Sequence, residues 1–191
     1  TPISMLQRGD IHFNPDLPKR KRQEIMKERM PGGLKVFLRF SQRFYPDLTY
    51  VGGFLQGGVL NECGYYNVAL GKNSVCNVLG LFTQGAKAER YIAQSTEEDL
   101  LNYVLSELDS MFDGKASRLY EDHVIHNWTR EPYIHGSYSQ RKASAKKLAE
   151  PVAGKVFFAG EAMNVDGKTI AVHGASASAY TAVDAMCRPA A

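Results

Sequence analysis

Cysteine is scarce in this sequence, and its spacing excludes the two kinds of site that cysteine most often builds. The 191-residue chain has three cysteines, Cys63, Cys76 and Cys187, and no Cys-x-x-Cys pair. A dispersed, odd-numbered set does not build a disulfide framework or a zinc site, so no metal is expected. Unpaired thiols are typical of a reducing compartment, and we therefore predict a cytoplasmic protein.

Long apolar runs and a strong net charge are also missing. No run reaches the length of a membrane-spanning helix and no leader sequence is evident, so a membrane partner is not expected. The formal net charge of +3 is too small to favour a nucleic-acid partner. The densest basic run, Lys19–Arg22, is expected to form a solvated helix face, with a nuclear import signal as the alternative.

The dinucleotide-binding fingerprint is absent as well, because no Gly-x-Gly-x-x-Gly segment follows a predicted strand. That fingerprint forms the turn whose backbone N–H groups hold the pyrophosphate in Rossmann-type domains. The first residues show no initiator methionine. Thr1 to Leu6 is interpreted as the end of a buried strand that enters a turn, so we expect a fragment or processed product of a longer protein.

The composition is that of a folded globular protein, with 44% hydrophobic, 10% aromatic and 23% charged residues. Strands are predicted at 34–40, 65–70, 74–82, 123–128 and 155–159, with a hairpin and loop over 51–64. Helices are predicted at 19–30, 96–112 and 173–186. Because strands and helices do not alternate strictly, an α+β fold with a mixed sheet and flanking helices is favoured.

The helix over 96–112 is the clearest of these elements. Ser95 and Glu98 have the spacing of a capping box, and Asp113-Gly114 ends the segment. Its apolar residues recur at the helical period and are expected to be core: Leu100, Leu101, Val104, Leu105, Leu108, Met111 and Phe112.

The segment from 156 to 179 contains a candidate cofactor site. A predicted strand ends in Gly160-Glu161, a loop follows, and a helix rich in small residues opens after Ala171 and Val172. Small residues at a helix N-terminus let backbone N–H groups approach an anion or an electron-rich ring edge, and the helix dipole favours negative charge there. By pattern alone, such a segment is more often close packing than a cofactor site.

The same segment resembles the C-terminal FAD-binding signature of the flavin-containing amine oxidases, with Phe-Phe-Ala-Gly-Glu at 157–161 and Val-His-Gly-Ala at 172–175. The family includes monoamine, polyamine and spermine oxidases and flavin-dependent histone lysine demethylases. The resemblance implies that Gly160 and Glu161 meet the ribityl–pyrophosphate region of FAD. It also implies that Ala171 and Val172 face the pyrimidine edge of the flavin, where negative charge develops.

A second stretch resembles the same family independently, because residues 128–139 read Trp-x-x-x-Pro-Tyr-x-x-Gly-Ser-Tyr-Ser. The resemblance implies that Trp128 packs beside the flavin and that Trp128, Tyr133 and Tyr138 line the substrate site. Flat aromatic walls exclude water and suit a cationic amine. No cysteine directly follows this stretch, unlike the monoamine oxidases that attach their flavin covalently, so noncovalent FAD is expected.

Lys35, in the predicted strand 34–40, stands where the family has a lysine that contacts flavin N5 through a water. The resemblance implies a catalytic role, since an ammonium there can stabilise charge on the ring or help to activate oxygen. Without the resemblance, a lysine in a strand is usually an exposed residue. Residues 11–18 also match, reading Ile-x-Phe-x-Pro-x-Leu-Pro, so the matches run through the whole chain.

The resemblance divides the chain into a portion of the substrate-binding domain, 1–150, and a C-terminal FAD-binding segment, 151–191. The second is expected to be a strand–loop–helix that belongs to the FAD-binding domain. In the family, the Gly-rich fingerprint that is missing here holds the ADP half of FAD. The cofactor site of this chain is therefore expected to be incomplete, with the missing N-terminal FAD-binding portion as its partner.

The reaction that the resemblance implies is oxidation of a C–N bond of an amine or polyamine to an imine, with O2 reduced to H2O2. Two alternatives stay open. An L-amino-acid oxidase-like flavoenzyme of the same superfamily would need a cation for the substrate carboxylate, and Arg39 and Arg130 are the candidates. A non-catalytic fragment or binding module without FAD is the other, and the missing fingerprint favours it.

Overall fold

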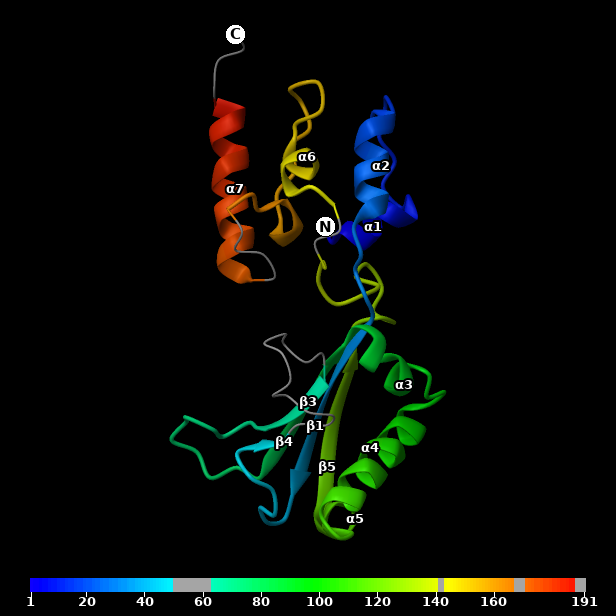
Figure 1. The fold of residues 1–191 in the computed structure, drawn as a ribbon, viewed down its shortest axis with the longest axis vertical. Helices are drawn as coiled ribbons and strands as arrows, with labels where there is room; N and C mark the ends of the chain where they lie inside the picture. Colours follow the sequence, from blue (N-terminus) through cyan, green and yellow to red (C-terminus); the bar gives the residue numbers. More distant parts are fainter. Residues whose placement is uncertain (50–62, 141–142, 167–170, 188–191) are drawn as a thin grey trace. The chain divides into compact units, whose positions relative to one another are not determined.

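The computed structural model describes residues 1–49, 63–140, 143–166 and 171–187 (Figure 1). The chain forms two compact units, each described by itself. The sheet unit is Gly32–Thr129, and the helical unit combines Thr1–Pro31 with Arg130–Ala191. Helices and an antiparallel sheet together make the fold α+β, as the sequence predicts. The functional division expected after residue 150 concerns substrate and cofactor binding, and it stays a prediction.

The sheet unit is built on five strands in the order β2-β3-β4-β1-β5. Their bounds are β1 Gly33–Phe40, β2 Leu48–Thr49, β3 Cys63–Asn67, β4 Val78–Gln84 and β5 Tyr120–Asn127. Each of the described strand pairings is antiparallel, so the sheet is not the mixed one that was expected. An antiparallel sheet is stable with one covered face, which leaves its second face for other contacts.

Helices cover one face of this sheet (Figure 1). They are η1 Gly85–Lys87, α3 Glu89–Ile92, α4 Glu97–Met111 and α5 Lys115–Leu119. Alternate residues of β1 point to that face, and Leu34, Val36 and Leu38 form one buried cluster with Val104 and Leu108 of α4. Because side chains alternate along a strand, the residues between them lie on the opposite face.

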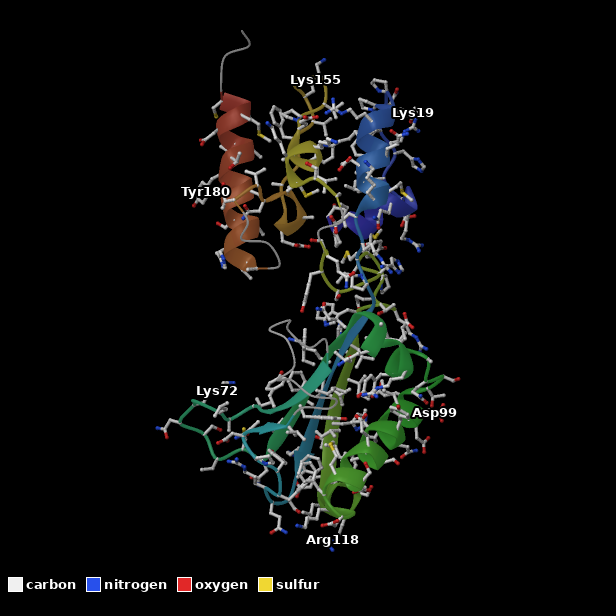
Figure 2. The ribbon with its side chains drawn as sticks, viewed as in Figure 1. Lys19, Lys72, Asp99, Arg118, Lys155 and Tyr180 are labelled. Atoms are coloured by element: carbon white, nitrogen blue, oxygen red, sulfur yellow. The ribbon has the colours of Figure 1, made fainter. Side chains whose placement is uncertain are left out.

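The helix α4 confirms the prediction over 96–112, but a different residue pair caps it. Thr96 Oγ1 accepts a hydrogen bond from the N–H of Asp99 at 3.0 Å, and Asp99 Oδ2 accepts one from the N–H of Thr96 at 3.1 Å. The expected pair, Ser95 with Glu98, has the same spacing one residue earlier. Thr96 has the extended backbone that an N-cap needs (φ −119°, ψ 166°), and this conformation decides between the two pairs. Asp99 is labelled in Figure 2.

The remaining strands of the sheet unit lie near their predicted positions. The prediction over 34–40 is confirmed as β1, whereas those over 65–70, 74–82 and 123–128 appear as β3, β4 and β5 with shifted bounds. The partner strand sets these bounds, since the β3–β4 ladder ends where Asn67 pairs with Leu79. Most of the predicted hairpin and loop lies outside the described residues.

The helical unit contains α1 Ile3–Arg8, α2 Lys19–Lys27, α6 Ala145–Ala149, η2 Glu161–Met163 and α7 Val172–Cys187. Its buried cluster draws on both segments of the unit and comprises Ile3, Leu17, Ile25, Leu148, Phe158, Ala162 and Met163. The helices predicted over 19–30 and 173–186 are confirmed as α2 and α7, although α2 ends earlier.

Two strands expected in this unit do not form. The opening residues are the helix α1, which ends at Gly9 in the left-handed conformation (φ 76°). So short an apolar run has no periodicity that separates helix from strand. Residues 155–159 form a loop before Gly160 in place of the predicted strand, and the pairing described there is a single isolated bridge between Val152 and Val156. A strand requires a neighbouring strand, which the described part of this unit does not supply.

The basic run 19–22 is solvated only in part, because Lys21 points inward and is 6% exposed. Its ammonium donates to the carbonyl oxygens of Lys147 (3.1 Å), Leu148 and Glu150 (2.8 Å). Burial lowers the pKa of Lys21 to about 8, and the charge of Glu150 raises it in part. Lys21 therefore caps the C-terminus of α6.

Two buried glutamates at the end of α2 hold the chain that follows residue 139. Glu24 and Glu28 are each 4% exposed. The Glu28 carboxylate accepts hydrogen bonds from the N–H groups of Gln140 and Ala143, both at 3.0 Å. The Glu24 carboxylate accepts one from the N–H of Ser144 at 2.7 Å. Carboxylates thus satisfy main-chain donors that no regular element satisfies.

Acid is expected to destabilise the helical unit through Glu24. The N–H of Ser144 holds the pKa of Glu24 below its ordinary value of 4.5, and the ammonium groups of Lys27 and Lys147 act in the same direction. A carboxylate with a lowered pKa contributes stability above its unfolded pKa and loses it as the pH falls through the folded pKa. The urea midpoint of the unsubstituted chain should therefore fall more between about pH 6 and about pH 3 than that of Glu24→Gln. Equal falls in the urea midpoint for the two proteins would contradict this prediction. Asp184→Asn, which changes an exposed side chain, should show the same fall as the unsubstituted chain.

Candidate functional site

Lys35 is the third residue of β1 and lies on the sheet face opposite the helices of its unit. Its register partners are Phe82 on β4 and His126 on β5. The side chain is half-buried, and its Nζ atom lies 5.9 Å from the centroid of the Phe82 ring. The fold therefore places a cation on a surface lined by rings, where it can act on a nearby developing charge.

Trp128 follows β5 directly and continues this surface. Its ring centroid lies 4.0 Å from that of His126, with an interplanar angle of 59°. The side chain is 36% exposed, so part of the indole is available for contact. Because His126 is opposite Lys35 in register and packs against Trp128, the four residues Lys35, Phe82, His126 and Trp128 form one group, the β1–β5 cluster.

Phe82 and His126 were not predicted as site residues. Alternation along β4 and β5 predicts which face of the sheet a side chain lies on, but it does not predict that Phe82 and His126 lie beside Lys35. Their position depends on the register with which β4 and β5 pair with β1, and this register joins residues far apart in the chain.

Arg39, a candidate for binding a substrate carboxylate, is engaged with two acids. Its Nε atom lies 3.4 Å from Glu121 Oε2, and its Nη2 atom lies 3.6 Å from Asp122 Oδ2. The side chain is 57% exposed at the far end of β1. The structure therefore gives the amino-acid oxidase alternative no support at Arg39. Arg130, the other candidate, is exposed in the helical unit.

Tyr133 lies in a tight segment of the helical unit and is 78% exposed. Its φ of 69° and that of His135, 51°, are in the left-handed region that side chains rarely adopt. It lines a cavity of about 620 Å³ together with Met5 and Arg8. Tyr138 is half-buried and does not line this cavity, so these two of the three predicted substrate residues are not brought together there.

Gly160 and Glu161 are held by hydrogen bonds within the helical unit. Gly160 has φ 153°, and its N–H and carbonyl oxygen each form a 2.9 Å hydrogen bond with the hydroxyl of Ser178 on α7. The Glu161 carboxylate accepts from the N–H and the hydroxyl of Ser139, at 2.8 and 2.7 Å. Ser139 and Ser178 were not predicted as site residues, since their partners lie elsewhere in the chain.

The predicted cofactor residues Ala171 and Val172 lie at the first turn of α7. The N–H of Gly174 donates to the carbonyl oxygen of Ala171 at 3.0 Å, so the N–H groups of Val172 and His173 precede the intrahelical ladder. Asn164, which is 2% exposed, donates to the carbonyl oxygen of Gly174 at 3.0 Å and holds this turn. N–H groups without an intrahelical partner and the helix dipole favour negative charge at this end. Contact of Ala171 and Val172 with flavin stays a prediction.

The predicted site residues fall into two sets, one in each unit. The sheet unit contains Lys35 and Trp128, and the helical unit contains Tyr133, Tyr138, Gly160, Glu161, Ala171 and Val172. The roles assigned to them by resemblance stay predictions.

Neither a metal centre nor a membrane-crossing helix is found in the part of the chain that the structure describes. No three His, Cys, Asp or Glu side chains gather there as a metal site requires. None of the helices in the described ranges has both the length and the apolarity needed to cross a bilayer. Cys76 and Cys187 are free and exposed.

The fold is shared with solved amine oxidases. A putrescine oxidase bound to putrescine matches 98% of this chain with a TM-score of 0.74 and 18% identity, over 42% of its own length. A cyclohexylamine oxidase from Brevibacterium oxydans matches 97% of this chain with a TM-score of 0.70 and 20% identity, over 41% of its own length. The architecture is therefore that of part of an amine oxidase.

Sequence comparison assigns the family. The family model described as flavin containing amine oxidoreductase matches residues 1–187. The chain is 30% identical over 188 residues to Polyamine oxidase 5 from Oryza sativa subsp. japonica, covering 96% of this chain and 37% of that protein. It is 29% identical over 173 residues to Lysine-specific histone demethylase 1B from Mus musculus, covering 85% of this chain and 20% of that protein.

The chain thus belongs to the flavin containing amine oxidoreductase family, as its motifs predicted. It spans 37% and 20% of the lengths of those two relatives.

Proposed function

We propose that this chain is the C-terminal portion of an FAD-dependent amine oxidase that acts on an amine or polyamine. The β1–β5 cluster is the observation that supports this best, because Lys35 lies among rings on the sheet face opposite the helices, and Trp128 extends that surface. FAD, when bound, supplies the two-electron oxidation of the C–N bond to an imine and returns the electrons to O2 as H2O2. Membership of a flavin containing family supports the cofactor.

In this proposal the protein residues position the amine, exclude water from it and polarise the flavin ring. The ammonium of Lys35 stabilises negative charge that develops beside it. Trp128 forms a flat wall that excludes water, and Tyr133 and Tyr138 offer aromatic faces to a cationic amine. The N–H groups at the first turn of α7 hold the electron-rich edge of the cofactor.

The proposal assigns residues 1–150 to substrate binding and 151–191 to noncovalent FAD binding, with an N-terminal FAD-binding portion as partner. The outer side of α7 supports such a partner, because its apolar residues are exposed: Val172 88%, Tyr180 72%, Val183 52% and Met186 53%. Tyr180 is labelled on that helix in Figure 2. Apolar stripes of this kind are surfaces that another part of a protein covers.

Flavin absorbance and peroxide release test the proposal. The purified chain, mixed with FAD and desalted, should retain little absorbance near about 450 nm. A longer protein with an FAD-binding portion should be yellow, release its FAD on denaturation, and produce H2O2 with members of an amine panel. A colourless longer protein would overturn the proposal in favour of a non-catalytic module. A yellow protein that oxidises L-amino acids and no other amine would favour the amino-acid oxidase alternative.

A further inference from the structure

Two serines hold Tyr138 between them in the helical unit. Ser137 donates to the carbonyl oxygen of Pro31 from its N–H (2.8 Å) and from its hydroxyl (3.0 Å). Ser139 donates from its N–H (2.8 Å) and its hydroxyl (2.7 Å) to the two oxygens of the Glu161 carboxylate. Each neighbour of Tyr138 is thus bound twice to one acceptor group, which fixes the main chain on both sides of the aromatic residue.

The two anchors of Tyr138 differ in kind, because Pro31 contributes a main-chain carbonyl and Glu161 contributes a side chain. Ser139 is 0% exposed, so its hydrogen bonds to the carboxylate are shielded from water. Hydrogen bonds to an ionised acceptor are shorter and stronger than neutral ones. Glu161 is itself fixed, since the residue before it, Gly160, is bonded to Ser178 through both its N–H and its carbonyl oxygen.

We propose that Glu161 is a positioning residue whose carboxylate orients Tyr138 through Ser139. The link connects η2 and α7, the predicted flavin-binding segment, to an aromatic wall of the predicted substrate site. This inference rests on the proposed function. It gives the Glu161 carboxylate a task inside the protein, in place of the cofactor contact that the resemblance implies.

Glu161→Gln separates the effect of the two hydrogen bonds to Ser139 from the effect of the negative charge. Glutamine has the same shape, and its carbonyl oxygen accepts the N–H of Ser139 while its amide donates to the serine hydroxyl, which is both donor and acceptor. Both hydrogen bonds are kept and the charge is lost. Glu161→Ala removes both hydrogen bonds, and Ser139→Ala removes the one made by the hydroxyl.

The test measures kcat, KM and flavin content of the FAD-loaded longer protein with an amine that it oxidises. Glu161→Ala should lower kcat/KM by about 10- to 100-fold, chiefly through a higher KM, because the aromatic wall loses its orientation. Flavin content and the position of the flavin band should not change. Ser139→Ala should shift KM in the same direction by less, and Glu161→Gln, the conservative variant, should restore KM most of the way to that of the unsubstituted protein.

The double variant Glu161→Ala with Ser139→Ala should be no worse than Glu161→Ala alone, since the serine hydroxyl then has no carboxylate to lose. Glu98→Gln, which removes an exposed carboxylate from α4 of the sheet unit, should change none of these quantities. If Glu161→Ala fails to fold, Ser139→Ala and Glu161→Gln still decide, because Ser139→Ala must raise KM and Glu161→Gln must raise it less.

A Glu161→Gln variant as impaired as Glu161→Ala, or a loss of flavin from both, would show that the charge acts on the cofactor directly and would overturn the inference. Additive losses in the double variant would overturn it too, since the two residues would then act independently. An unsubstituted protein that binds no flavin or oxidises no amine would instead refute the proposed function, and this role with it. The two failures are distinguishable because the second is seen before any substitution is made.

Discussion

Replacing Lys35 with methionine is expected to slow amine oxidation by about 10²- to 10³-fold in the FAD-loaded longer protein. Methionine keeps much of the length and packing of the lysine chain and removes its charge. Lys35 is half-buried beside Phe82 and His126, so its ammonium acts at a weakly polar surface where charge is poorly screened. Stopped-flow absorbance should locate the loss in flavin reduction by the amine under anaerobic conditions or in reoxidation by O2.

Two further variants make this result specific. Lys72→Met removes a lysine from the exposed connection between β3 and β4, labelled in Figure 2, and should leave both rate constants unchanged. Lys35→Arg keeps the charge with a bulkier, planar head and should recover part of the rate. Unchanged rate constants for both half-reactions of Lys35→Met would remove Lys35 from the proposed site.

Replacing Glu107 with alanine is expected to destabilise the sheet unit by about 3 kcal/mol, because buried hydroxyls lose their acceptor. Glu107 lies on α4, and its Oε2 atom accepts hydrogen bonds from the hydroxyls of Tyr65 and Tyr91, both at 2.7 Å. Its Oε1 atom lies 2.9 Å from Nη2 of Arg90. Tyr65 and Tyr91 are 1% and 0% exposed, so water cannot replace the carboxylate. Urea unfolding followed by circular dichroism measures the loss.

The matched control for Glu107 is Glu98→Ala, on the same helix. Glu98 is exposed in the first turn of α4, where a carboxylate contributes only about 0.3–1 kcal/mol through the helix dipole. Adding Tyr65→Phe to Glu107→Ala should recover part of the stability, since it removes a hydroxyl that has lost this acceptor. A loss for Glu107→Ala no larger than that for Glu98→Ala would show that the carboxylate does not support the fold.

The local pattern around Lys35 illustrates how far sequence reasoning reaches. Alternation over 34–40 predicted the strand, and the structure confirms it as β1. The same alternation cannot show that Phe82 and His126 flank the lysine, because a shift of register by one residue would turn their side chains to the other face. The β1–β5 cluster therefore became visible only once the strands were paired.

Competing local signals explain the errors. Ser95 with Glu98 and Thr96 with Asp99 have the same spacing, and the backbone conformation at Thr96 chose the second pair. The apolar residues over 155–159 have strand composition, but the described part of the helical unit provides only the bridge at Val156. In each case the sequence offered a valid local option, and packing selected another.

The sequence by itself determined the family and the elements with long regular patterns, β1, α4 and α7, because periodicity and motif spacing are properties of neighbouring residues. Tertiary structure alone decided which buried polar groups meet: Lys21 with the end of α6, Glu107 with two tyrosines, and Ser139 with Glu161. A buried hydrogen-bond donor needs an acceptor, and in each of these cases the acceptor lies in another segment of the chain. The candidate site follows the same division, with residue types set by the motifs and their neighbours set by packing.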